Sequence, residues 1–456
     1  MAGLFALSID PAVYRGKFLD DLFWETFYRQ HLGEQYGGLS TWDGKKIKIQ
    51  THRGLFRHTF QNNLMDLEGT EGIGYCGHTR EPLFVHSKIG EMSVCFSGNI
   101  INRQELVDEF KNFDHTFERG GDDIEVIVKL IVQGVDIIDG IKRMAEKIKG
   151  AFALLVLTKE GIYAARCSTG HWPLVIGEKK GAVAVSSESG GFKNFGFKLV
   201  RDLKPGEIVL LKEGKIETKG TISGEKVQIC SFVWVYTAFP NGVFEGVPAS
   251  LVRKRLGAAL ARRDIERGFI PDIVTPVPDS GRFHAIGYHQ EFCRQMMEGK
   301  IRRVPLYDEV LLKWPYAGRS FTPQDEEERK LEAHIKLLVS GENYIDKVLV
   351  INEDSIVRGT QTSENLVPKV ESIGVKEIHF RSSNPELNSY CPYGKTTKKG
   401  ELFAAKIPSE KERIEFLGSK AENKQIVKSL KYNTIEDLVE AIGPPREQLC
   451  VDCDLL

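Results

Sequence analysis

The chain has 456 residues, of which 41% are hydrophobic, and its formal net charge at pH 7 is −1. This length predicts two or three domains of about 150 residues each, with enough apolar side chains to fill their cores. The balanced charge argues against a nucleic-acid partner, and no apolar run reaches the ~20 residues of a membrane span. Because Met1 to Ile9 lacks the basic start and long apolar middle of a signal peptide, we expect a cytoplasmic protein.

The first half of the chain has the pattern of an antiparallel sheet protein. Two amphipathic helices are predicted, at Arg103 to Asn112 and at Asp123 to Gly134. Short apolar strands are separated by turns such as Lys212-Glu213-Gly214, and they are predicted at Ala151 to Thr158, Ile162 to Ala165, Val183 to Ser186 and Ile208 to Ile216.

From about Ile229 the pattern changes to alternating strands and helices, which is typical of a parallel α/β sheet. The clearest helix is predicted at Ser250 to Gly268. Val348 to Ile351 is predicted to be a buried parallel strand, and Ser363 to Ser372 continues with helical spacing. We therefore place a domain boundary between residues 228 and 229, which gives domains at 1–228 and 229–456.

The stretch Lys347 to Thr362, KVLVINEDSIVRGTQT, has the residue types of a sugar-phosphate site at the carboxyl end of a strand. Glu353 and Asp354 offer acceptors to two vicinal ribose hydroxyls. Backbone N–H groups around Gly359 can surround a phosphate, together with hydroxyls at Ser355, Thr360 and Thr362. An ordinary strand-to-helix turn with a capping Ser or Thr is the alternative interpretation.

The sequence EDSIVRGT resembles the phosphoribosyl-pyrophosphate (PRPP) motif of amidophosphoribosyltransferases. PVPDSG at Pro276 to Gly281 and YAGRSF at Tyr316 to Phe321 look like two further loops of that family, in the same order along the chain. The resemblance implies an α/β type I phosphoribosyltransferase domain and a Mg²⁺ site at Glu353 and Asp354. It also implies PRPP binding by Asp279, Ser280, Gly281, Arg319, Lys336, Glu353, Asp354, Ser355, Arg358, Gly359, Thr360 and Thr362.

The first half resembles the N-terminal-nucleophile (class II) glutaminase domain of the same family, an α+β fold with αββα layers. Arg80 in Gly77-His78-Thr79-Arg80 matches the arginine that holds the glutamine carboxylate, and Asp123 matches the acid that holds its ammonium group. Gly98 and Asn99 match the pair that forms the oxyanion hole. Taken singly, Asn99 could be a turn residue and Asp123 a helix cap.

The family begins Met-Cys-Gly, whereas this chain begins Met1-Ala2-Gly3, so the catalytic thiolate is replaced by a methyl group. We therefore expect the glutaminase reaction to be lost. Further departures from the family pattern occur at Leu32, Glu81, Cys167 and Trp172 in the first half, and at Phe239, Asn241, His334 and Gln361 in the second.

Eight cysteines include the pair Cys450-x-x-Cys453, and disulfides are not expected in a cytosolic chain. This spacing alone is compatible with zinc, redox or iron–sulfur roles, or with a reduced pair that binds no metal. The resemblance implies a [4Fe–4S] cluster held by Cys230, Cys391, Cys450 and Cys453. Cys76, Cys95, Cys167 and Cys293 are expected to be free thiols.

Together these features predict an amidophosphoribosyltransferase-like enzyme that forms 5-phosphoribosylamine and pyrophosphate from PRPP and ammonia. The resemblance further implies a homotetramer, glutamine as the family's nitrogen donor, and purine nucleotides as inhibitors. Two alternatives remain open: a non-catalytic protein that binds PRPP, glutamine or nucleotides and regulates a partner, and an engineered Ala2 in an otherwise working amidotransferase.

Overall fold

A computed structural model describes residues 2–60, 66–224, 226–316, 334–341, 344–394, 397 and 400–455. The chain divides into two compact units. The first contains Met1–Cys230, Asn241–Gly246 and Pro392–Lys395, and the second contains Ser231–Pro240, Val247–Cys391 and Thr396–Leu456. In the described part of the chain, every helix is too short or too polar to cross a lipid bilayer.

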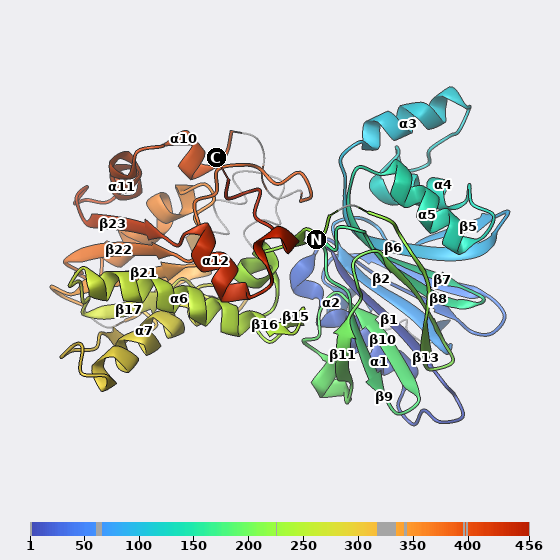
Figure 1. Ribbon diagram of the computed structural model, residues 1–456, viewed down its shortest axis with the longest axis horizontal. Helices are drawn as coiled ribbons and strands as arrows, with labels where there is room; N and C mark the ends of the chain where they lie inside the picture. Colours follow the sequence, from blue (N-terminus) through green and yellow to red (C-terminus); the bar gives the residue numbers. More distant parts are fainter. Residues whose placement is uncertain are drawn as a thin grey trace. The chain divides into compact units, whose positions relative to one another are not determined.

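The first unit is built on two antiparallel sheets that pack face to face (Figure 1). The seven-stranded sheet has the order β11-β9-β10-β1-β4-β2-β3, and the six-stranded sheet has the order β13-β12-β8-β7-β6-β5. The strands are β1 (Gly3–Ile9), β2 (Tyr36–Trp42), β3 (Ile47–Arg53), β4 (Glu71–Gly77), β5 (Leu83–Ser87), β6 (Gly90–Ile100), β7 (Gly150–Thr158), β8 (Gly161–Arg166), β9 (Val175–Lys179), β10 (Ala182–Ser186), β11 (Lys198–Asp202), β12 (Glu207–Lys212) and β13 (Lys215–Thr221).

Helices cover the outer faces of both sheets. Helix α1 packs on β1 and β4, whereas α4 and α5 pack on the six-stranded sheet, beside β6 and β13 respectively. This αββα arrangement confirms the predicted glutaminase-type fold. The helices of the unit are α1 (Phe18–Phe27), η1 (Gln30–Leu32), α2 (Phe56–Thr59), α3 (Arg103–Asn112), α4 (Asp123–Ile131), α5 (Ile137–Lys147) and η3 (Phe192–Phe195).

Most of the predicted elements in this half are confirmed, and one is wrong. The segment Ile208 to Ile216 is not one strand, because the chain reverses at Glu213 and Gly214 between β12 and β13. Both turn residues have positive φ, 50° and 70°, as tight hairpin turns require. The helix predicted to reach Gly134 ends at Ile131, where the chain turns toward α5.

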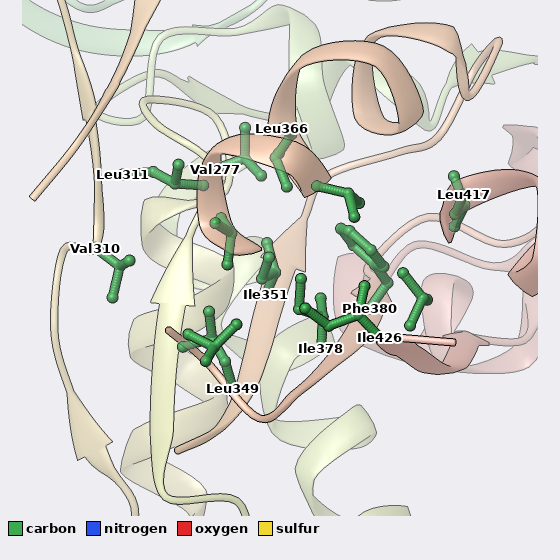
Figure 2. Packing of buried hydrophobic residues seen from close by; sticks show 14 of the residues in the cluster. Val277, Val310, Leu311, Leu349, Ile351, Leu366, Ile378, Phe380, Leu417 and Ile426 are labelled. Atoms are coloured by element: carbon green, nitrogen blue, oxygen red, sulfur yellow. The ribbon is translucent and has the colours of Figure 1, made fainter. Parts of the chain in front are cut away.

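The second unit contains a five-stranded sheet of order β18-β17-β21-β22-β23 whose described pairs are parallel. Central strand β21 is apolar because both of its faces are covered. Val350 faces the cluster formed with α6 and α7, which run side by side in Figure 1, while Leu349 and Ile351 join Ile378 and Phe380 on the other face (Figure 2). This architecture confirms the predicted phosphoribosyltransferase-type α/β fold.

The strands of the second sheet are β17 (Ile273–Pro276), β18 (Leu306–Tyr307), β21 (Val348–Glu353), β22 (Glu377–Ser382) and β23 (Val427–Tyr432). The helices are η4 (Val233–Thr237), α6 (Ala249–Glu266), α7 (Arg282–Met297), η5 (Thr362–Leu366), α9 (Val367–Glu371), α10 (Phe403–Lys406), α11 (Glu410–Gly418), α12 (Ile435–Ile442) and η6 (Arg446–Gln448). Short strands complete the chain: β14 (Ile229–Cys230), β15 (Val243–Phe244), β16 (Val247–Pro248), β19 (Leu311–Lys313), β20 (Leu337–Val339) and β24 (Leu449–Cys450).

Candidate functional site

The loops after β17 and β21 lie against each other at the carboxyl end of the second sheet. The N–H of Val277 donates to the carbonyl of Asn352 at 2.9 Å, and that of Gly281 donates to Val277 at the same distance. A Cβ at Gly281 would lie 2.4 Å from the Asn352 oxygen, so only glycine fits this approach. Two of the loops predicted to bind PRPP are therefore brought together.

Glu353 and Asp354 form a buried acidic pair at this end of β21. Burial raises the pKa of Glu353 well above its ordinary value, and the neighbouring Asp354 carboxylate raises it further, whereas Lys336 opposes the shift. Burial likewise raises the pKa of Asp354, against hydrogen bonds from Ser280 and Ser355. The Ser355 hydroxyl donates to Asp354 Oδ2 at 2.8 Å.

One carboxylate oxygen of the Glu353–Asp354 pair accepts no hydrogen bond in the described structure. Within the described residues, Glu353 Oε2 is buried without a hydrogen-bond partner, as are both side-chain amide atoms of Asn352. A buried acceptor without a donor is unfavourable, so this oxygen suits a ligand hydroxyl or a cation. The two carboxylates fit a Mg²⁺ ion only if water or a phosphate supplies its other ligands.

The turn that follows contains a glycine in the left-handed region of backbone conformation. Gly359 has φ of +72°, and a Cβ there would lie 2.8 Å from the Phe403 ring. Thr362 begins η5 and is buried. The Arg358 guanidinium, predicted to bind PRPP, donates instead to Glu401 Oε2 from Nε at 3.1 Å and from Nη2 at 2.6 Å.

Two basic side chains contact Asp279 in the loop after β17. Lys313 donates to Asp279 Oδ2 at 3.1 Å, and Arg282 lies 3.3 Å from the other oxygen of Asp279. The carboxylate of Asp279 is thus already paired with two cations. Arg319 and most of the predicted closing loop lie outside the described residues.

In the first unit, Ala2 lies where the resemblance places the nucleophile. Its side chain is 6% exposed, and its backbone N–H donates to the Ser97 hydroxyl at 2.8 Å. Ser97 directly precedes Gly98 and Asn99 on β6, so Ala2 lies next to the predicted oxyanion-hole pair. A Cβ at Gly98 would lie 2.1 Å from the Ala151 oxygen on β7, which requires glycine there.

The Asn99 amide is engaged by the protein itself. Its Nδ2 donates to the backbone carbonyl of Pro392 at 2.7 Å, within the same unit. The adjacent Tyr393 ring packs on His171, with ring centroids 4.5 Å apart. A backbone carbonyl therefore occupies the donor that would otherwise stabilise an oxyanion.

The two predicted glutamine-binding residues both contact other protein side chains. Arg80 Nε donates to the Thr51 hydroxyl on β3 at 2.9 Å, and Asp123 lies 3.7 Å from Arg103. Three strand spacings separate β3 from β1 in the order β1-β4-β2-β3, which is about 14 Å. Arg80 also lines an open cavity of about 640 Å³ together with Arg119, Glu118 and Phe84.

Two buried arginines were not predicted from the sequence, because each resembles an ordinary residue of a helix or turn. Arg253 on α6 is 1% exposed and donates to the carbonyls of Trp234, Tyr236 and Ala238. Arg29 is equally buried and pairs with Glu25 on α1. A single arginine within a helical pattern carries no signal that distinguishes a buried clamp from a solvent-exposed side chain.

All eight cysteines lie within the described residues. None of the eight forms a disulfide. Burial raises the pKa of the Cys450 thiol to about 12, and the Cys391 thiol adds to the shift. In the described ranges, no three His, Cys, Asp or Glu side chains are arranged to hold one metal ion.

Glu81 is one of the departures from the family pattern. Its surroundings predict that the stability of the fold depends on pH. It is fully buried, and its carboxylate accepts from the Thr79 hydroxyl at 2.6 Å and from the Phe96 N–H at 2.9 Å. Burial raises its pKa from 4.5 to about 8 despite these hydrogen bonds. The folded chain therefore holds this proton more tightly than the unfolded chain, and stability is lost as pH rises from about 4.5 to about 8.

We expect Glu81→Gln to remove most of this dependence, because an amide cannot ionise. Between pH 5 and pH 8 the thermal midpoint of the wild-type first unit should fall roughly 5–10 °C more than that of the variant. Thermal unfolding followed by circular dichroism measures this difference. Glu91→Gln, which changes an exposed carboxylate on β6, is the control. Equal pH dependence in Glu81→Gln and wild type would contradict the prediction.

Comparison with known proteins identifies the family. Residues 75–194 match the model of a glutamine amidotransferase domain. The amidophosphoribosyltransferase of Methanocaldococcus jannaschii is 33% identical, over 95% of this chain and 92% of that protein, and that of Bacillus subtilis is 29% identical over 91% and 85%. The structure of the glutamine PRPP amidotransferase from B. subtilis with ADP and GMP superimposes with a TM-score of 0.84 at 27% identity, covering 99% of this chain and 96% of that one. The chain therefore belongs to the amidophosphoribosyltransferase family.

Proposed function

We propose that this chain aminates PRPP with ammonia, giving 5-phosphoribosylamine and pyrophosphate for purine synthesis, and that it does not hydrolyse glutamine. The observation that carries the first part is the buried Glu353–Asp354 pair, with an unused acceptor, beside the Asp279-Ser280-Gly281 loop. In this reaction the nitrogen lone pair forms a bond to C1 of PRPP. The C1–O bond breaks, pyrophosphate leaves with its electron pair, and the nitrogen loses a proton.

The described residues suit the positioning that this reaction needs. Glu353 and Asp354 accept from two ribose hydroxyls, and backbone N–H groups around Gly359 hold the 5′-phosphate. Lys336 is near enough to Glu353 to affect its charge, and it supplies a cation for the leaving group. Mg²⁺, when bound at Glu353 and Asp354, would neutralise pyrophosphate charge. To bind PRPP, the Arg358 guanidinium must release Glu401 and contact a phosphate group instead.

Three observations support loss of the glutaminase reaction. Ala2 has no nucleophilic atom. The Asn99 amide donates to Pro392 instead of lying open to an oxyanion. Arg80 points toward Thr51 on β3. The last two observations concern residues other than Ala2, so a change at residue 2 alone does not account for them.

The test is pyrophosphate release from PRPP and Mg²⁺ by anaerobically purified protein, with either ammonium or glutamine as nitrogen donor. We expect release with ammonium only, and we expect Ala2→Cys to leave the glutamine reaction inactive because Asn99 and Arg80 still bond Pro392 and Thr51. Release from glutamine by the wild-type chain would contradict the loss. If PRPP binds without release from either donor, the regulatory protein is favoured over the enzyme.

We further propose that Cys230, Cys391, Cys450 and Cys453 bind a [4Fe–4S] cluster. In support, the N–H groups of Asn388 and Ser389, just before Cys391, both donate to the carbonyl of Cys453. Anaerobic protein should then contain about four iron atoms and four sulfides per chain. Cys450→Ala should lose this iron. Cys293→Ala, which changes a partly buried thiol beside His289 on α7, should keep it. Equal iron content in the two variants would contradict the assignment.

Purine nucleotides are proposed inhibitors, because the B. subtilis relative is described in complex with ADP and GMP. The homotetramer and the cytoplasmic location remain predictions.

A further inference from the structure

A chain of hydrogen bonds connects the acidic pair of the second unit to the segment near residue 454. The N–H of Ser383 donates to the carbonyl of Glu353 at 2.9 Å, and the N–H of Asn384 donates to the carbonyl of Asp354 at 2.7 Å. The Asn384 side-chain amide then donates to Asp454 Oδ1 at 2.6 Å. Two hydrogen bonds thus separate Asp454 from the backbone of Asp354.

Asp454 is itself firmly held. Its N–H donates to the carbonyl of Val451 at 2.9 Å, and its own carbonyl accepts from the Asn388 side chain at 3.3 Å. The N–H groups of Asn388 and Ser389 both donate to the carbonyl of Cys453, at 2.9 and 3.1 Å. The segment around Asp454 is therefore fixed to the loop that contains Asn384.

The Asn384–Asp454 pair is unusual because both polar side chains are buried and each leaves one oxygen without a partner in the described structure. Asn384 is fully buried and Asp454 is 5% exposed. Within the described residues, Asn384 Oδ1 and Asp454 Oδ2 have no hydrogen-bond partner. Burying a carboxylate with one oxygen unpaired is unfavourable for folding, and such costs are found preferentially where a function retains them.

We propose that Asp454, acting through Asn384, is a positioning residue for the Asp354 turn of the PRPP site. This inference rests on the proposed transferase function. Asp454 fixes the Asn384 side chain, and Asn384 then holds the Asp354 carbonyl with its backbone N–H. The two carboxylates of the pair are thereby oriented toward the ribose hydroxyls. A small displacement of such groups has a large effect on binding and rate.

The experiment compares Asp454→Ala and Asp454→Asn with Glu440→Ala, an exposed carboxylate on α12. We expect Asp454→Ala to raise KM for PRPP about tenfold, equivalent to about 1.4 kcal/mol, with a smaller change in kcat. Asp454→Asn keeps an oxygen acceptor for Asn384, so it should behave like wild type. An unchanged KM in Asp454→Ala, or equal losses in the Ala and Asn variants, would overturn the proposal.

Hydrogen exchange without PRPP tests the connection from Asp454 through Asn384 to Asp354 independently of activity. In Asp454→Ala the backbone amides of residues 383–389 should exchange faster than in wild type, and in Asp454→Asn and Glu440→Ala they should not. Unchanged exchange in Asp454→Ala overturns the link itself. If wild type does not turn over PRPP, the proposed function fails in every variant alike, and the tenfold effect is then sought in the Kd for PRPP. Faster exchange with unchanged PRPP binding overturns the positioning role.

Discussion

Replacing Asp354 with asparagine should lower the ammonia-dependent reaction by about 100- to 1,000-fold, the size of effect seen when one preorganised polar group is removed from an active site. Asp354 is 4% exposed and follows β21 at the point where the two loops meet. Its carboxylate accepts from Ser355 and is stabilised by Ser280. An amide has the same shape but presents one oxygen fewer to the ribose hydroxyls.

The thermal stability of Asp354→Asn should be equal to or higher than that of wild type, although its activity falls. This combination separates a functional role of Asp354 from a structural one. Burial raises the pKa of Asp354, so the ionised carboxylate destabilises the fold at neutral pH. A neutral asparagine avoids this penalty, and the thermal midpoint of Asp354→Asn should equal or exceed that of wild type. Lower activity with higher stability is the signature of a group kept for function.

The matched control is Asp346→Asn, which changes an exposed aspartate just before the opposite end of β21. Asp346 has φ of 58°, a conformation that asparagine also adopts readily. We expect its activity to match wild type. Pyrophosphate release with ammonium and calorimetric binding of PRPP measure both variants. Equal activity in the two variants would contradict a catalytic role for Asp354.

Local patterns in the sequence predicted the elements that depend on neighbours close in the chain. The helix at Arg103 to Asn112 has the predicted bounds, and the strand predicted at Val348 to Ile351 continues further, to Glu353. The apolar run and the turn after it specify this strand end, because parallel strands are buried on both faces and ligands bind at their carboxyl ends. The turn at Lys212-Glu213-Gly214 was predicted, but the strand predicted at Ile208 to Ile216 ran across it, so β12 and β13 were predicted as one strand.

Side-chain partners far apart in the chain could not be predicted in this way. Asn99 and Pro392 are 293 residues apart, and Asn384 and Asp454 are 70 residues apart. No local periodicity encodes such a pair, since each partner alone looks like a turn residue. The resemblance predicted which residues belong to each site. It could not predict that Arg80 would point toward Thr51, because that direction depends on how the strand edges pack.

A large loss of stability is expected when Asp264, which supports the sheet behind the proposed PRPP site, is replaced. Arg381 on β22 donates to both of its carboxylate oxygens, from Nε at 2.6 Å and from Nη2 at 3.0 Å, and the Tyr288 hydroxyl donates at 2.7 Å. Asp264 and Arg381 are 2% and 3% exposed. Removing one partner of such a buried pair leaves an uncompensated charge and costs about 3–5 kcal/mol.

Asp264→Ala should therefore lower the thermal midpoint of the second unit by about 10 °C, since 1 kcal/mol corresponds to roughly 2–4 °C in a domain of this size. Lys300→Ala, which breaks an exposed 2.8 Å pair with Glu298, should cost only about 0–1 kcal/mol. Both variants are compared by calorimetry at the same pH. A midpoint for Asp264→Ala close to that of Lys300→Ala would contradict the prediction.

A double variant identifies the cause of the loss. If the cost comes from the unpaired Arg381 charge, then Asp264→Asn combined with Arg381→Met should be more stable than Asp264→Ala alone, because the buried cation is removed and asparagine still accepts from Tyr288. If the double variant is less stable than the single one, the packing of Arg381 on the Phe269 ring, 5.3 Å away, stabilises the fold by more than its unpaired charge costs. In that case the guanidinium stabilises the sheet through its contacts with the ring and with the Phe380 carbonyl, independently of Asp264.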